Sequence, residues 1–456
     1  MIFLKRKRLI FWLLRAYLKK WGKTIGAFFI FGFSIIFLLF FNRNLLFSKI
    51  PVVNSQRVGV AGIYSSRDVP SNLPEIILSK SSRGLTKISE KGEVTADIAK
   101  SWEIKDDGKT FVFYLKEGIR FSDGEELDSS AINYNFEDAT IERPAKQVII
   151  FKLRHKYSPF LVTLANHRIF KENYVGISDY KIKKIKKNDE FIRSIELVNA
   201  LDKQKIEYIF YDTQEALKHA YVLGEITSII DINDLNYKNK ISFENFNNTT
   251  TSKNINYNKI VTIFFNNSDP VLSDKKIRKA LAYSLPDTFP DGQRTRTPYV
   301  NEYWFSDKSQ DYERDIEYAR LLLEQTEASK SATIKIEVKA LPQYKTLAES
   351  VSKEWEKIGI KTKIEVVYGV PSSYQVFLGE LPVLRDPDQY TLWHTGQDSN
   401  ITNYRNLRID KLLEDGRRTY NTSERRKIYS DFQKYLLDDM PAAFLFFPYT
   451  YTISRK

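Results

Sequence analysis

The stretch Val94–Glu137, VTADIAKSWEIKDDGKTFVFYLKEGIRFSDGEELDSSAINYNFE, decides the fold of this chain of 456 residues. Apolar residues alternate with polar ones at 102–104 and again at 111–115, and the polar run 105–109 lies between them. This period of two is typical of a half-buried β-hairpin. The sequence therefore predicts two antiparallel strands joined by a tight turn.

The residues after this hairpin predict a short strand and then a helix. The strand is expected from Ile119 to Phe121, because the Ser122-Asp123-Gly124 turn follows it directly. Asp128 or Ser129 can then cap a helix. We expect this helix to bury three apolar positions, Ile132, Phe136 and Ala139.

Four landmarks in this stretch resemble, in kind and in order, the signature of the oligopeptide- and dipeptide-binding family of extracellular solute-binding proteins, family 5. They are Ala99-Lys100-Ser101-Trp102-Glu103, Asp107-Gly108-Lys109-Thr110-Phe111, Lys116-Glu117-Gly118-Ile119-Arg120-Phe121-Ser122-Asp123-Gly124 and Asp128-Ser129-Ser130. The resemblance extends over residues from about 58 to 456. It implies a two-lobed α/β fold of the periplasmic-binding-protein type II, with an extra subdomain.

A second stretch is similar to the same family, which has a strand ending in Phe-Asn and then a helix. Val261–Asn266 matches the strand, and Asp274–Leu281 matches the helix, for which Ser273 is the expected cap. Ser273 and Lys276 also fit the Ser-x-x-Lys spacing of acyl-enzymes. No companion motif is present, so capping explains Ser273 better.

The region 334–366 predicts a βαβ unit. Apolar residues alternate at 334–338 and 364–366, and those at 344–358 have helical spacing that Gly359 ends. A helix of this length between two strands implies a parallel pair with a right-handed crossover. Further helices are expected at 312–323, 407–418 and 423–437, and a closing strand at 442–449.

The positive charge of the chain is concentrated at its N-terminus. The formal net charge is +13, but residues 1–50 hold ten Lys and Arg and no acidic residue. The remaining 60 basic and 57 acidic residues nearly cancel. A nearly neutral body argues against nucleic acid as a partner.

An apolar, uncharged run of 18 residues, Thr24–Phe41, follows most of this positive charge. Its length is close to the roughly 20 residues that span a bilayer as a helix. The basic residues before it place the N-terminus in the cytoplasm and residues 50–456 outside the cell. A cleaved secretory signal is the alternative. No small-residue cleavage site follows the run and the chain has no Cys for lipid attachment, so an uncleaved single-pass anchor is expected.

The length of the chain exceeds what a single core usually supports, so several lobes are expected. The predicted division assigns a cytoplasmic basic segment and transmembrane anchor to 1–50, the first part of lobe I to 51–80, subdomain II to 81–173, the second part of lobe I to 174–265, lobe III to 266–430 and a return to lobe I to 431–456.

No residue pattern predicts catalysis, a cofactor or a metal site. The four His residues show no metal-ligand spacing, and no Gly-rich phosphate loop, Gly-x-Ser-x-Gly motif or Cys is present. We therefore expect a binding protein, not an enzyme.

The candidate ligand-binding segment is Leu384–His394, LRDPDQYTLWH. In peptide-binding members of the family that the chain resembles, an acidic residue near such a Pro-Asp segment accepts the ligand's α-ammonium group by a charge-assisted hydrogen bond. Asp386 is the first candidate and Asp388 the second. Tyr390 and Trp393 can offer flat apolar walls. The other candidate ligand-binding residues are His394, Tyr64, Phe265 and Asn266. An Asp-Pro turn followed by ordinary core aromatics is the alternative.

The resemblance implies a function in solute capture. The ligand would be an oligopeptide or similar solute outside the cell, and the partner an ABC importer permease. Closure of the lobes around the ligand would be a hinge motion. A membrane-tethered structural or sensory protein that keeps the fold without transport is the alternative.

Overall fold

The computed structural model describes residues 12, 15–17, 19–23, 55–67, 69–70, 72–238, 240–310, 312–327 and 333–456. The chain divides into two compact units, Met1–Asn54 and Ser55–Lys456. In the first unit, the described residues between 12 and 23 are helical. No helix among the described residues is long and apolar enough to cross a membrane. The predicted span Thr24–Phe41 lies outside those residues.

A large mixed sheet runs through the second unit. In the order of hydrogen-bonded neighbours, its strands are β18 (Lys361–Val366), β17 (Lys335–Ala340), β19 (Val376–Pro382), β15 (Lys259–Phe265), β20 (Ala442–Arg455), β11 (Ser228–Ile232), β1 (Ser55–Ala61), β10 (Lys205–Tyr211), β9 (Phe191–Asn199) and β8 (Tyr180–Asn188). Two further strands, β14 (Thr249–Ile255) and β16 (Gly292–Arg294), pair with β20 beside this path.

The long strand β20 belongs to both halves of the large sheet. Its first part, residues 442–446, pairs with β15, and its last part, residues 451–454, pairs with β11. All of these pairings are antiparallel, whereas β1 is parallel to its neighbours β10 and β11. A single strand of 14 residues therefore connects the two halves.

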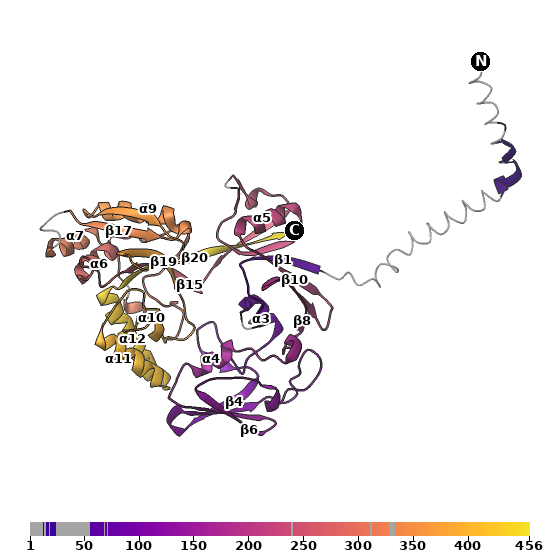
Figure 1. The fold of residues 1–456 in the computed structure, drawn as a ribbon, viewed down its shortest axis with the longest axis horizontal. Helices are drawn as coiled ribbons and strands as arrows, with labels where there is room; N and C mark the ends of the chain where they lie inside the picture. Colours follow the sequence, from indigo (N-terminus) through magenta and orange to yellow (C-terminus); the bar gives the residue numbers. More distant parts are fainter. Residues whose placement is uncertain are drawn as a thin grey trace, which may run out of the picture. The chain divides into compact units, whose positions relative to one another are not determined.

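The α-helices described in the second unit are α3 (Glu75–Ser81), α4 (Phe160–Asn166), α5 (Gln214–Leu223), α6 (Lys275–Tyr283), α7 (Ile316–Glu324), α9 (Lys345–Glu356), α10 (Tyr390–Trp393), α11 (Leu407–Arg418) and α12 (Thr422–Asp439). Figure 1 shows α9 beside β17, and α11 and α12 next to each other. The helices predicted at 407–418 and 423–437 and the closing strand are confirmed.

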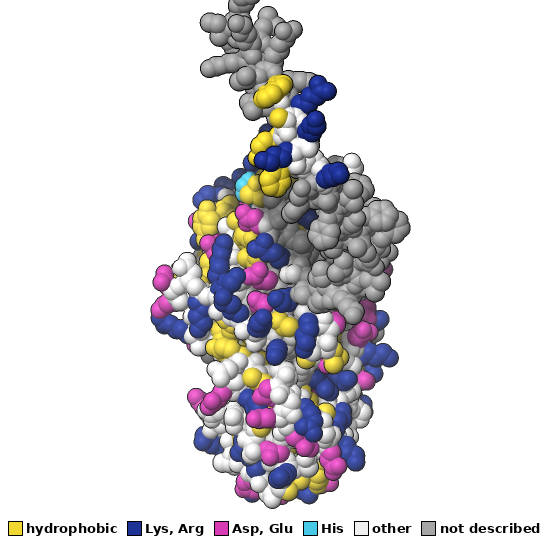
Figure 2. Space-filling model, turned by 90° about the vertical axis from the view of Figure 1, so that its right-hand side faces the viewer, with side chains coloured by type: hydrophobic (Ala, Val, Ile, Leu, Met, Phe, Trp, Pro, Cys, Tyr) yellow, Lys and Arg dark blue, Asp and Glu magenta, His cyan; other side chains and the backbone are white. Residues whose placement is uncertain are grey.

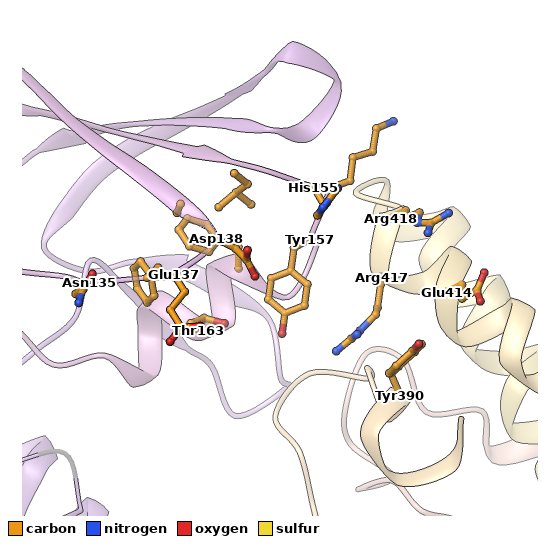
Figure 3. Close-up of a pocket in the computed structure, with 15 residues that line it drawn as sticks. Asn135, Glu137, Asp138, His155, Tyr157, Thr163, Tyr390, Glu414, Arg417 and Arg418 are labelled. Atoms are coloured by element: carbon orange, nitrogen blue, oxygen red, sulfur yellow. The ribbon is translucent and has the colours of Figure 1, made fainter. Parts of the chain in front are cut away.

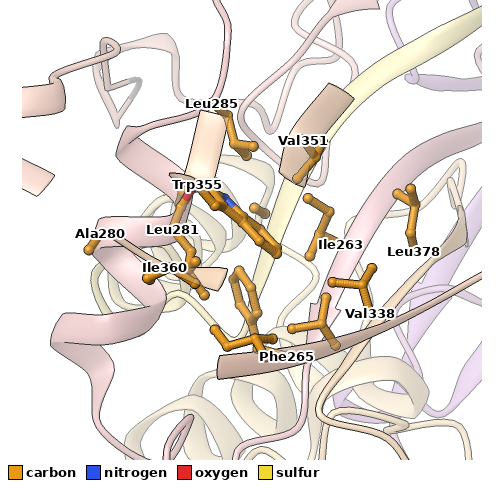
Figure 4. Close-up of a cluster of buried hydrophobic side chains, with 14 of the residues drawn as sticks. Ile263, Phe265, Ala280, Leu281, Leu285, Val338, Val351, Trp355, Ile360 and Leu378 are labelled. Atoms are coloured by element: carbon orange, nitrogen blue, oxygen red, sulfur yellow. The ribbon is translucent and has the colours of Figure 1, made fainter. Parts of the chain in front are cut away.

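The predicted βαβ unit is confirmed. β17 and β18 are parallel neighbours, and α9 joins them and packs on both. Trp355 of α9 is fully buried, and its indole nitrogen donates a hydrogen bond of 3.0 Å to the carbonyl of Leu281. Figure 4 shows Trp355 and Phe265 within the same apolar cluster. Burial of this aromatic and aliphatic surface removes it from water and stabilises this part of the fold.

A separate sheet of four strands contains the stretch that decides the fold. Its order is β4 (Ala99–Lys105), β5 (Thr110–Leu115), β7 (Val148–Leu153) and β6 (Ala139–Ala145), all antiparallel. We call residues 86–166, which include this sheet, a small two-stranded sheet, β2 (Thr86–Ile88) with β3 (Val94–Ala96), and α4, the small-sheet region. The hairpin predicted at 102–115 is confirmed. The residue bounds predicted for the lobes stay a prediction.

Two predictions for the end of this stretch are wrong. Residues 119–121 form no strand but only an isolated bridge between Arg120 and Glu126. Asp128 does cap a helical turn, but that turn is a 3-10 helix of three residues, Ser129–Ala131. Residues 132–136 form no helix, and the apolar residues at 132, 134 and 136 alternate with exposed polar ones, which is the period of a strand.

Two predictions elsewhere also need correction. The cap of α6 is Asp274, whose side chain accepts a hydrogen bond from the backbone nitrogen of Lys276. Ser273 instead donates to the carbonyl of Pro270. Residues 236–259 are rich in Asn, Lys and Thr, which predicts an irregular segment. They are not irregular throughout, because β14 pairs along its whole length with β20.

Candidate ligand-binding site

The first carboxylate of the candidate segment, Asp386, is held in a buried ion pair. Arg425 of α12 donates from Nη1 to Oδ2 at 2.9 Å and from Nη2 to Oδ1 at 2.5 Å. The same arginine donates from Nε to the carbonyl of Gly416 in α11. Asp386 also accepts a hydrogen bond from the backbone nitrogen of Asp388. Asp386 therefore ties its loop to two helices, and capture of a ligand ammonium by it stays a prediction.

The second carboxylate, Asp388, holds a different arginine. Arg417, in the last turn of α11, donates from Nε to Asp388 Oδ2 at 2.7 Å. The other oxygen, Oδ1, accepts from the backbone nitrogen of Tyr390. Burial raises the pKa of Asp388, and the charge of Arg417 opposes that rise. Because the carboxylate is buried and already bonded, its effect on a ligand would pass through Arg417.

The aromatic residues of α10 divide between the core and the surface. Trp393 is buried, and its indole nitrogen donates to Gln389 Oε1 at 2.7 Å, so it packs as a core residue. Tyr390 is partly exposed and stacks on His394, with ring centroids 4.1 Å apart. The guanidinium of Arg417 lies over the ring of Tyr390, 4.1 Å from its centroid. Tyr390 is therefore the residue of α10 best placed to contact a solute.

The three remaining candidates lie elsewhere in the fold. Tyr64 follows β1 and packs against Phe210, with ring centroids 4.7 Å apart, and burial raises its pKa. Phe265 is fully buried in the cluster of Figure 4, so its ring is a core element. Asn266 donates to the carbonyl of Tyr374 and accepts from Asn403, which makes it part of a turn. A ligand contact by any of these residues stays a prediction.

A cavity of about 690 Å³ lies between the small-sheet region and the helices α10 and α11. Figure 3 shows Tyr157, His155, Glu137 and Asp138 on one wall, and Tyr390, Glu414, Arg417 and Arg418 on the other. The volume is in the range of small-molecule sites, and aromatic rings and charges of both signs line it.

Direct hydrogen bonds join the two walls of this cavity. The hydroxyl of Tyr420, just after α11, donates to the carbonyl of Gly108 at 2.7 Å and accepts from the backbone nitrogen of Tyr157 at 2.9 Å. Ser158 donates to the carbonyls of Gly416 and Arg417. The Asp-Gly turn of the signature stretch therefore contacts the residues just after the helix that carries Arg417.

A match to a family model shows which protein family the chain belongs to. The family model described as bacterial extracellular solute-binding proteins, family 5 Middle, matches residues 93–147 and 137–400. The chain belongs to this family. The predicted family membership is thus confirmed by most of the second unit, not only by the signature stretch.

Known proteins resemble the chain over most of its length. A probable D,D-dipeptide-binding periplasmic protein, DdpA of Escherichia coli, is 22% identical over 78% of this chain and 79% of its own. The oligopeptide-binding protein AppA of Bacillus subtilis, solved with a nonapeptide, superposes with a TM-score of 0.63 at 19% identity, covering 88% of this chain and 95% of that chain. NikZ of Campylobacter jejuni, solved with Ni(L-His), gives 0.69 at 20% identity, covering 89% and 94%.

These two structures confirm the mixed α/β, two-lobed fold that the sequence predicts. The matched proteins are named for solutes that they bind, which supports a binding protein and not an enzyme. Figure 2 shows Lys and Arg side chains interspersed with Asp and Glu over the described part of the face. This mixed surface agrees with the nearly neutral charge of residues 51–456.

Sequence reasoning did not identify the residues that complete the site of this family 5 protein. No sequence pattern indicates a binding role for Arg417, Arg425, Tyr157 or Tyr420. Arg417 does lie in a correctly predicted helix. The available signal was an arginine pair, Arg417-Arg418, at the end of that helix. Arginines are favourable at helix C-termini in any case, so the pair alone does not indicate a binding site.

Proposed function

We propose that the protein captures oligopeptides or similar solutes outside the cell and delivers them to an ABC importer. The observation that carries the proposal is the cavity between the small-sheet region and α10–α11, in a chain of family 5. Relatives named for dipeptides and oligopeptides support a peptide ligand. In this proposal Tyr390 contacts the ligand directly, Asp388 acts on the ligand through Arg417, and Asp386 holds its loop in place through Arg425.

Equilibrium dialysis of the purified full-length protein against a pool of tetrapeptides tests this proposal. Peptide retained by the protein and identified by mass spectrometry is the expected result. Cross-linking in membranes of the source cells should also recover a permease with the protein. A folded protein that retains no peptide and cross-links to no permease would favour the tethered structural or sensory role.

The same proposal includes retention of Thr24–Phe41 as an anchor. The apolar run, the basic residues before it and the lack of a cleavage site support this part. Edman sequencing of the protein extracted from membranes should begin near residue 1. A sequence that begins near residue 50 would show that the segment is removed.

A further inference from the structure

We propose that Arg417 binds the free carboxylate of a zwitterionic peptide in the cavity of Figure 3, with its guanidinium held between Tyr390 and Tyr157. This inference rests on the proposed function and names the ligand group that the site selects. The acidic segment 384–394 predicts that the site binds a positively charged group of the ligand. In this inference the group bound by Arg417 is instead negatively charged.

The guanidinium of Arg417 is fixed before any ligand binds. Its carbon lies 4.1 Å from the ring centroid of Tyr390 and 5.5 Å from that of Tyr157. Asp388 accepts a hydrogen bond from Nε at 2.7 Å. Stacking on an aromatic ring and a bond to Nε leave little freedom for the planar group, so less entropy is lost when it binds a second partner.

The two terminal nitrogens of Arg417 remain available as donors. Within the part of the chain that the structure describes, Nε is the only atom of this guanidinium that donates a hydrogen bond. Figure 3 shows the group pointing from α11 toward Tyr157, across the cavity. Nη1 and Nη2 form a planar fork whose spacing matches the two oxygens of a carboxylate.

The buried acidic residues of the same wall are not available in this way. Both oxygens of Asp386 accept from Arg425, and both oxygens of Asp388 accept from Arg417 or the backbone of Tyr390. A ligand ammonium could therefore bind Asp386 or Asp388 only by displacing a guanidinium from a buried carboxylate. A ligand carboxylate can bind Arg417 without breaking any of these contacts.

The opposite wall explains why the ligand should also carry a positive charge. On this wall Lys156 is paired with Asp107, and Asp138 is paired with Arg154. The exposed carboxylates of Glu137 and Asp138 line the cavity. A second anionic group near them would be repelled, whereas an ammonium would be attracted. A peptide with both termini free satisfies both walls, with its C-terminal carboxylate on Arg417.

The test compares three forms of one tetrapeptide pool on the full-length protein: free termini, C-terminal amide and N-terminal acetyl. Amidation should weaken binding about tenfold or more, because it removes the charge-assisted bonds of the fork. Acetylation should weaken binding less than amidation does. Equal affinity of the free and amidated pools would overturn the inference without any variant.

Three variants separate the role of Arg417 from general charge. Arg417→Gln should weaken binding of the free pool about tenfold or more and leave the amidated pool nearly unchanged. Arg417→Lys keeps the charge but not the fork, and should recover only a small part of the loss. Arg408→Gln is the matched control, because Arg408 is an exposed arginine of α11 that stacks on Tyr435 away from the cavity.

The outcomes distinguish this inference from the proposed function. If the wild type binds no pool, the proposed function and the inference both fail. If it binds the free pool but Arg417→Gln, with an unchanged circular dichroism spectrum, binds it equally well, only the inference fails. Equal losses in Arg417→Gln and Arg408→Gln would also overturn it, because the effect would then be one of net charge.

Discussion

Asp386→Asn should destabilise the protein strongly, because it removes the charge opposite Arg425. The two side chains are only 9% and 7% exposed, so Arg425 would remain buried without a counter-ion. Removing one partner of a buried ion pair typically costs about 3–5 kcal/mol. Asn keeps the shape and can accept one of the two guanidinium bonds, so we expect a loss of about 3 kcal/mol in the free energy of unfolding.

Urea unfolding of the full-length protein, followed by near-ultraviolet circular dichroism, measures this loss as a shift in the midpoint. Asp415→Asn is the matched control on α11. Its partner Lys411 lies at 2.7 Å, but the two side chains are 41% and 64% exposed. Exposed pairs contribute about 0–1 kcal/mol.

A second substitution tests the cause of the loss. In the double variant with Arg425→Met, no uncompensated charge remains, so the total cost should be less than the sum of the two single costs. If Asp386→Asn shifts the midpoint no more than Asp415→Asn does, our reasoning about the buried pair is wrong.

Two further predictions concern the contact between the small-sheet region and α11. Burial raises the pKa of Tyr420 to about 12, so its hydroxyl stays neutral while the unfolded chain ionises near 10.0. The stability that this provides is complete below pH 10 and is lost as the pH rises toward 12. In Tyr420→Phe, the free energy of unfolding at pH 7 should be lower by about 1–3 kcal/mol, because the carbonyl of Gly108 loses its donor. Above pH 10 the free energy of unfolding of the variant should fall less steeply with pH than that of the wild type. An equally steep fall would show that the Tyr420 hydroxyl does not cause this pH dependence. In the same urea assay, Gly108→Ala should destabilise the protein more than Gly118→Ala does. Both positions have positive φ, so each substitution costs about 1–2 kcal/mol from the backbone alone. Only at Gly108 would the new Cβ lie 2.1 Å from the ring of Tyr420. Equal losses would show that this ring moves away freely.

The sequence predicted those parts of the fold in which local periodicity and burial agree. The hairpin at 102–115 and the βαβ unit at 334–366 have clear periods of two and 3.6, and both formed as expected. The helix expected after Asp128 failed because Ile132 and Phe136, four apart, fit a helix as well as a strand. Tyr134 between them, which is partly buried, makes the period two.

The candidate site could be located from the sequence but not completed. The segment 384–394 does line the cavity, through Tyr390. Its acidic residues, however, are paired with arginines that lie 29 and 39 residues further along the chain. Such pairs depend on how α11 and α12 pack against the loop, which no local pattern records. For this reason the sequence suggested free carboxylates where the structure has buried ion pairs.

The most direct test of the central claim is to identify what the protein carries. The full-length protein should be purified from its own cells in mild detergent, washed, denatured, and analysed by mass spectrometry for released small molecules. We predict release of short peptides with free C-termini in amounts comparable to the protein. Recovery of no small molecule, from a protein that also fails to bind the free tetrapeptide pool, would contradict the account.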